Sequence, residues 1–219
     1  MPKYILFDLD GTLTDPYEGI INSFQYALAH FGVIEEDPEK LRQLIGPPLR
    51  ENLARYVDNV EKGVELYREH FGAAGLYENS LYDGIPELLE SASATGFTLA
   101  IASSKAQVYV RQIAEHFGIA HFFAFIGGSE LDGRRSEKAE VIKYVMEAIG
   151  AAYMDSVLMI GDRKHDIIGA KSCKVTSIGV LYGYGTKEEL EAAGADYTVE
   201  TVTELKNLLK TPTLFTTAF

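Results

Sequence analysis

The sequence Tyr-Ile-Leu-Phe-Asp-Leu-Asp-Gly-Thr at residues 4–12 places a short apolar run directly before two carboxylates. Such a run is typical of a buried strand in a parallel sheet. Similar runs, which we also expect to be strands, lie at residues 97–102, 122–126, 157–160, 175–181 and 197–199. Ligands of open parallel sheets bind beyond the carboxyl ends of the strands. We therefore look for chemistry first at Asp8 and Asp10.

Segments with apolar residues at three- and four-residue spacing alternate with these runs, which predicts amphipathic helices. They cover residues 85–95, 107–116, 138–149, 187–193 and 202–209. The alternation predicts an α/β fold, a Rossmann-like doubly wound parallel sheet with helices on both faces.

The connection between the first two expected strands is far longer than one crossover helix requires. It contains helical patterns at residues 19–31, 49–57 and 64–71. We therefore expect a small α-helical cap domain at 16–81, inserted into a core domain formed by 1–15 and 82–211. A C-terminal tail at 212–219 shows little pattern and receives no function.

The chain has 219 residues, with 20 Lys+Arg against 32 Asp+Glu and a formal net charge of −12. We expect no nucleic-acid partner, because affinity for polyphosphate comes mainly from clustered Lys and Arg. The single cysteine, Cys173, can form neither an intramolecular disulfide nor a cysteine zinc cluster. No apolar stretch suits a signal peptide or a membrane span, so we expect a cytoplasmic protein without a membrane partner.

A second pair of carboxylates, Asp162 and Asp166, follows the run at 157–160. The first pair, in Asp8-Leu9-Asp10-Gly11, could by itself equally well form a turn, because Asp-Gly commonly begins one. An EF-hand is excluded, because Gly19 stands where its loop needs a glutamate. Four carboxylates at one sheet edge would repel each other without a hard divalent cation, and oxygen ligands favour Mg²⁺.

Two hydroxyls and a lysine complete the candidate residues. Ser103 and Ser104 follow the second expected strand, where either could simply cap the next helix. Lys138 begins a helix, where a cation opposes the helix dipole, and this is a mild indication of function. We expect three other charges to be solvated at the rim, where any could touch a ligand: Lys105, Lys164 and His165.

In this order the residues resemble the four motifs of the haloacid dehalogenase superfamily. The motifs are Asp8-Leu9-Asp10-Gly11-Thr12, Ser103, Lys138 and Gly161-Asp162-x-x-x-Asp166. The resemblance covers residue 4 to about 200, and the insertion matches the family's helical cap. The sequence is most similar to phosphoglycolate-phosphatase-like members, through segments at 46–49, 82–85 and 179–185.

The resemblance implies a Mg²⁺-dependent phosphomonoesterase. Asp8 would be the nucleophile that forms an aspartyl-phosphate, and Asp10 the general acid and then base. The phosphate would be bound by Gly11, Thr12, Ser103, Ser104 and Lys138. The metal would be held by the Asp8 carboxylate, the Asp10 backbone carbonyl and Asp162, with Asp166 acting through water or behind these ligands.

Several activities remain open within this resemblance. Asp10 argues against a dehalogenase, because dehalogenases of this superfamily lack the second acidic residue of the first motif. A phosphonatase needs a cap lysine, and Lys40 and Lys62 both lie among polar neighbours. We expect hydrolysis of a small phosphorylated metabolite, phosphoglycolate by similarity. The alternatives are a nucleoside 5′-monophosphate phosphatase (5′-nucleotidase), a sugar-phosphate mutase and a catalytically lapsed phosphate sensor.

Candidate cap contacts with the substrate are Tyr17, Arg50, Arg55 and Tyr77. The sequence indicates no oligomeric state.

Overall fold

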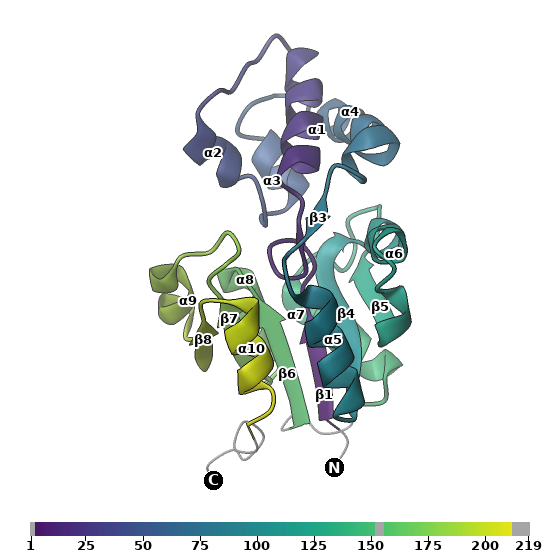
Figure 1. The fold of residues 1–219 in the computed structure, drawn as a ribbon. Coiled ribbons are helices and arrows are strands. Elements are labelled where there is room, and N and C mark those ends of the chain that lie inside the picture. Colours follow the sequence, from purple (N-terminus) through teal and green to yellow (C-terminus); the bar gives the residue numbers. More distant parts are fainter. Residues whose placement is uncertain (1–2, 152–155, 212–219) are drawn as a thin grey trace. The chain divides into compact units, whose positions relative to one another are not determined.

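The computed structural model describes residues 3–151 and 156–211, so the expected tail at 212–219 lies outside the described residues. Within that part of the chain, six parallel strands form one sheet in the order β5-β4-β1-β6-β7-β8 (Figure 1). Their bounds are β1 Lys3–Phe7, β4 Phe97–Ala106, β5 Phe123–Ser129, β6 Val157–Gly161, β7 Thr176–Val180 and β8 Tyr197–Val199. This order confirms the predicted α/β fold, because the chain adds strands first on one side of β1 and then on the other.

Helices cover both faces of this sheet. In Figure 1, α5 and α10 lie in front of it, and α7 and α8 lie behind it. The helices that follow β3 are α5 Ile85–Ala94, α6 Gln107–His116, α7 Lys138–Ala148, α8 Lys164–Ser172, α9 Lys187–Ala193 and α10 Val202–Leu208, with a 3₁₀ turn at Ala120–Phe122.

The described residues divide into two compact units. Thr14–Ser80 form one, which we call the helical unit. Residues 3–13, 81–151 and 156–211 form the other, the sheet unit. Two short strands, β2 Thr14–Asp15 and β3 Ser80–Leu81, pair with each other where the chain passes between the units.

Aromatic packing holds the helical unit together. Its helices are α1 Tyr17–Ala29, α2 Pro38–Arg42, α3 Leu49–Leu53 and α4 Val60–His70, and α4 continues into a π-helical turn at Phe71–Gly75. The Phe24 ring of α1 meets the Tyr67 ring of α4 edge-on at 5.0 Å, and Tyr67 stacks on Phe71 at 5.5 Å. Such pairs add to the free energy gained by burying the rings.

The core of the sheet unit includes a buried cluster shared by the sheet, α7 and α8. It includes Leu6, Ala100 and Met159 from the strands, Val141 and Val145 from α7, and Ala170 from α8. Cys173 lies in the same cluster, 3% exposed, with its Sγ 3.4 Å from the Ala139 carbonyl oxygen. This packing fixes α7 and α8 behind the sheet, which places their first turns at the carboxyl ends of β1, β4 and β6.

The sequence did not predict α8, because its apolar pattern is weak. Gly169 stands at a buried position of the helix without an apolar side chain, and Ile168 is 50% exposed although Ile167 is fully buried. In addition, β4 runs four residues further than the apolar segment 97–102. None of the helices in the described part of the chain is long and apolar enough to cross a membrane.

Candidate active site

The loop after β1 is fixed against the neighbouring strand β6. The backbone N–H of Asp8 donates to the Ile160 carbonyl at 2.8 Å. Gly11 has a φ of +80°, in the left-handed region, and a Cβ atom there would overlap the Asp162 carboxylate. Only glycine fits this position without strain, since it tolerates positive φ and brings no side chain. The loop therefore lies directly against the end of β6.

Lys138, the first residue of α7, connects three segments of the sheet unit. Its Nζ lies 2.9 Å from Asp8 Oδ1 and 2.7 Å from Asp166 Oδ1, and donates to the Ala102 carbonyl at 3.0 Å. The side chain is only 4% exposed. Burial alone would lower the pKa of Lys138, but the Asp166 and Asp8 carboxylates raise that pKa above its ordinary value. The lysine is therefore a buried, permanently charged group beside Asp8.

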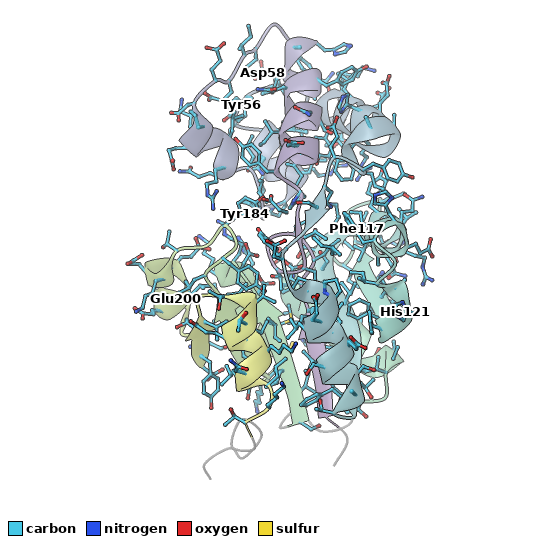
Figure 2. The ribbon with its side chains drawn as sticks, in the orientation of Figure 1. Tyr56, Asp58, Phe117, His121, Tyr184 and Glu200 are labelled. Atoms are coloured by element: carbon cyan, nitrogen blue, oxygen red, sulfur yellow. The ribbon has the colours of Figure 1, made fainter. Side chains whose placement is uncertain are left out.

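Asp162 follows β6 and is fully buried. Its Oδ2 accepts a hydrogen bond from the backbone N–H of Tyr184 at 2.8 Å. Tyr184, labelled in Figure 2, belongs to the loop after β7. Asp162 Oδ1 is buried and has no hydrogen-bond partner among the described residues. Burial, together with the charges of Asp166 and Asp8, raises the pKa of Asp162 well above its ordinary value.

Asp166 lies in the first turn of α8 and is held from two sides. Lys138 pairs with its Oδ1, and the Arg163 backbone N–H donates to its Oδ2 at 3.0 Å. Burial raises the pKa of Asp166 to about 6, against the lowering effect of Lys138. Asp166 is thus better placed to hold Lys138 than to offer a free oxygen.

The carboxylates of Asp8, Asp162 and Asp166 fit a divalent cation. One oxygen from each lies within 4.8 Å of the others, and all three residues are buried. Buried carboxylates gathered this closely, one with an unpartnered oxygen, repel each other unless a positive charge lies among them. Lys138 supplies one such charge, and a cation with oxygen ligands would supply the rest.

Asp10 forms a buried ion pair that the sequence did not predict. Lys105 Nζ lies 2.6 Å from Asp10 Oδ2, and the two side chains are 9% and 16% exposed. The expectation that Lys105 is solvated at the rim is therefore wrong. Burial raises the pKa of Asp10 above its ordinary value, although Lys105 lowers it in part.

None of the candidate hydroxyl groups caps a helix. Ser103 is 2% exposed, and its Oγ accepts from the Lys105 N–H at 3.3 Å. The N-cap of α6 is Ala106, so the capping alternative for Ser103 and Ser104 is wrong. Ser104 is half-buried, within β4. Thr12 is fully buried, and its Oγ1 has no hydrogen-bond partner among the described residues.

The other candidates from the sequence are less enclosed. Lys164 is exposed on α8. His165 is half-buried, and burial together with Arg163 and Lys164 lowers its pKa. In the helical unit, Tyr17 is half-buried. Arg50 is exposed and pairs with Glu61. The other candidates of this unit are also exposed: Arg55, Tyr77, Lys40 and Lys62. Lys40 and Lys62 pair with Glu35 and Glu65, as solvated lysines do.

Sequence reasoning also missed the loop after β7 as a support for Asp162. A Cβ atom on Gly183 would lie 2.5 Å from Asp162 Cβ and would overlap the Gly11 carbonyl oxygen. The Tyr182 hydroxyl donates to the Thr12 carbonyl at 3.0 Å. The only signal in the sequence was the glycine-rich segment at 179–185, whose role depends on this packing.

Comparisons with known proteins identify the class. The family model described as haloacid dehalogenase-like hydrolase matches residues 5–180. A predicted phosphatase from Clostridium acetobutylicum has the same fold, with a TM-score of 0.91 and 45% identity over 95% of this chain and 98% of that one. The chain belongs to the haloacid dehalogenase-like hydrolases and is a phosphatase of that superfamily, which confirms the predicted family and enzyme class.

Curated relatives differ in the activities that their names give. The 5′-nucleotidase of Pseudomonas aeruginosa is 49% identical over 192 residues, 86% of each chain. The tyrosine-protein kinase PtkA of Mycobacterium tuberculosis is 34% identical over 95% of this chain and 72% of its own. The phosphoglycolate phosphatase of Vibrio parahaemolyticus is 30% identical over 93% of this chain and 94% of its own. These similarities favour the 5′-nucleotidase alternative over phosphoglycolate.

Proposed function

We propose that this protein is a Mg²⁺-dependent nucleoside 5′-monophosphate phosphatase. The observation that carries the substrate class is the 49% identity to a 5′-nucleotidase over 86% of both chains. The identity to a phosphoglycolate phosphatase is 30%. The buried groups around Asp8 support the reaction type, because phosphoryl transfer depends on positioning and charge stabilisation.

Asp8 is the proposed nucleophile. One of its carboxylate oxygens attacks phosphorus in line, the bond from phosphorus to the ester oxygen breaks, and an aspartyl-phosphate forms on Asp8. Asp10 gives its proton to the departing ester oxygen, which leaves as the alcohol. Lys138, already 2.9 Å from Asp8, stabilises the negative charge on the transferring group. Ser103 and Thr12 donate hydrogen bonds to the phosphate oxygens, together with Ser104 and the backbone N–H of Gly11.

The second half-reaction returns the enzyme to its starting state. Asp10, now ionised, takes a proton from a water molecule as the water oxygen attacks phosphorus. The bond from phosphorus to Asp8 breaks, and inorganic phosphate leaves. Bound Mg²⁺ would neutralise charge on the phosphate, held by the Asp8 carboxylate, the Asp10 backbone carbonyl and Asp162. Asp166 would act through Lys138 or a bridging water.

The experiment measures phosphate release from several classes of ester at equal concentration. The panel contains nucleoside 5′-monophosphates, phosphoglycolate, hexose phosphates and p-nitrophenyl phosphate, each with MgCl₂ and with EDTA. We expect the largest kcat/KM for a nucleoside 5′-monophosphate, loss of activity in EDTA, and a loss of at least about 10³-fold in Asp8→Asn, which removes the nucleophile.

Each other result points to a different activity. A larger kcat/KM for phosphoglycolate would overturn the nucleotide proposal and leave the phosphatase mechanism standing. Conversion of one hexose phosphate into its isomer would indicate a mutase. Activity that survives Asp8→Asn would overturn the mechanism. Phosphate binding without turnover of any ester would indicate a catalytically lapsed sensor.

A further inference from the structure

The ion pair between Lys105 and Asp10 lies wholly within the sheet unit and is almost closed to solvent. The Lys105 ammonium meets Asp10 Oδ2 at 2.6 Å. The other oxygen, Asp10 Oδ1, is also buried but has no hydrogen-bond partner among the described residues. The two oxygens of one carboxyl group are therefore in different situations.

This difference separates the roles that the two oxygens can take. Oδ2 accepts a hydrogen bond from the Lys105 ammonium, which can only donate. If Oδ2 carried a proton, two donors would point at each other. A proton on Oδ1 meets no such conflict. Lys105 thus anchors Oδ2 and leaves Oδ1 as the carboxyl oxygen without a protein donor among the described residues.

Lys105 lies in an irregular part of β4, and its side chain is only 9% exposed. The register between β4 and β5 shifts between Ala102 and Ala106, so the alternation of a regular strand does not hold there. Burying an ammonium is costly unless it is paired, and the Asp10 carboxylate supplies the pairing. Lys105 and Asp10 therefore depend on each other, and Asp10 is the group proposed as acid and base.

We propose that Lys105 is a positioning residue for general acid–base catalysis, which fixes the Asp10 carboxyl group with Oδ1 toward the ester oxygen. The inference rests on the role of Asp10 in the proposed function, but not on which phosphate ester is the substrate. Lys105 acts through Asp10, so its removal should affect mainly those esters whose leaving group needs a proton.

The test uses substituted phenyl phosphates, which have similar shape but leaving groups of different basicity. Nitrophenolate departs readily without a proton, whereas unsubstituted phenolate is a poorer leaving group and gains more from protonation. The quantity measured is kcat/KM, which covers the steps up to departure of the phenol. In Lys105→Met we expect a loss of about 10²-fold for phenyl phosphate and less than about 10-fold for p-nitrophenyl phosphate.

A double-mutant cycle shows whether the lysine acts through Asp10. Asp10→Asn should steepen the dependence of kcat/KM on leaving-group basicity, and Lys105→Met should add nothing to that dependence in the Asp10→Asn background. Lys105→Arg, which keeps the charge, should recover part of the activity toward phenyl phosphate. Lys187→Met, at an exposed lysine of α9, is the matched control and should leave all rates unchanged.

The other outcomes separate the two proposals. An equal loss for every phenyl phosphate in Lys105→Met would overturn the positioning role and indicate phosphate binding. An Asp10→Asn variant with unchanged leaving-group dependence would overturn the acid role of Asp10 itself. If circular dichroism shows that Lys105→Met does not fold, Lys105→Gln, which also removes the charge, provides the same comparison, and Lys105→Arg remains the variant that keeps the charge.

Discussion

At the scale of a residue, the buried charge of Lys138 affects both the stability of the fold and the candidate site. It lies within 3 Å of one oxygen of Asp8 and one of Asp166, at 2.9 and 2.7 Å. Its pairing offsets part of the repulsion between these carboxylates. Removing one partner of a buried ion pair is strongly destabilising, because the other charge remains buried without compensation.

We therefore expect Lys138→Met to lower the free energy of unfolding by about 3–5 kcal/mol and to abolish phosphatase activity. Urea unfolding in EDTA, followed by circular dichroism, measures the first effect without interference from a bound metal. Lys187→Met removes an exposed lysine and should change the stability by less than about 0.5 kcal/mol. Equal midpoints for Lys138→Met and the wild-type protein would show that the carboxylates do not depend on this lysine.

The candidate residues that follow strands were predictable, whereas their partners were not. Asp8 and Asp162 stand directly after apolar runs, and parallel strands bring such positions to one edge. Lys105 gave no comparable signal, because the register of β4 against β5 is irregular there and simple strand alternation does not predict which way its side chain points. The contact of Gly183 with Asp162 depends on how the loop after β7 packs, which no local pattern of residues determines.

At the scale of elements, α8 is joined to α9 by an acidic side chain. Glu189 Oε1 accepts from Arg163 Nε and from the Lys164 backbone N–H, both at 2.9 Å. Burial alone would raise the pKa of Glu189, but these two donors hold it below its usual range. The site residue Asp166 lies on α8, so this link also supports the candidate site.

The sign of the pH effect follows from the lowered pKa. Glu189 contributes stability above the pKa of an unfolded glutamate, and that stability is lost as the pH falls through the folded-state pKa. Glu189→Gln should cost about 1 kcal/mol of unfolding free energy at pH 7, and the difference should shrink toward about pH 3. Glu191→Gln, exposed on the same helix, should be neutral at both pH values. A difference that stays constant with pH would contradict the assignment.

The sequence predicted most elements, and its failures have physical causes. Regular apolar spacing located α6 and α9 at the residues where the structure has them. The α8 pattern is weak because Gly169 packs against Lys138, where a Cβ atom would lie 2.8 Å from Lys138 Cγ. Close packing against the lysine, rather than helix periodicity, determines the residue at this position.

For the whole molecule, the negative charge and the candidate metal site are connected. The chain carries a formal net charge of −12, and several of its carboxylates are buried together at one edge of the sheet. A cation that binds there stabilises only the folded chain, because the unfolded chain has no such cluster. Metal binding should therefore be measurable as stability, independently of catalysis.

We expect MgCl₂ at a hundredfold excess over its dissociation constant to add about 2.7 kcal/mol to the free energy of unfolding. For a chain of this size that gain corresponds to a Tm increase of about 5–10 °C over EDTA. Asp162→Asn should remove most of the increase and leave the Tm in EDTA equal or higher, since it relieves repulsion. Asp58→Asn, exposed in the helical unit and labelled in Figure 2, should keep the full increase. Equal Tm values with and without Mg²⁺ would contradict the metal site.

The sequence predicted an inserted unit from the long connection between the first two expected strands and from the helical patterns within it. The expected cap at 16–81 and the observed helical unit Thr14–Ser80 differ by only a few residues. The difference lies at β2 and β3, whose two-residue strands are too short to give a periodic pattern. Only their pairing with each other defines them.

The reactivity of the buried Cys173 thiol can report local unfolding of the protein. A thiol that is 3% exposed and packed between α7 and α8 reacts with a soluble disulfide reagent only when that region opens. Since the sequence contains no other cysteine, the labelling rate refers to one place in the fold. Cysteines introduced at exposed positions would accept fluorescent dyes while the native thiol stays unmodified, so the motions of each unit can be followed without first removing Cys173.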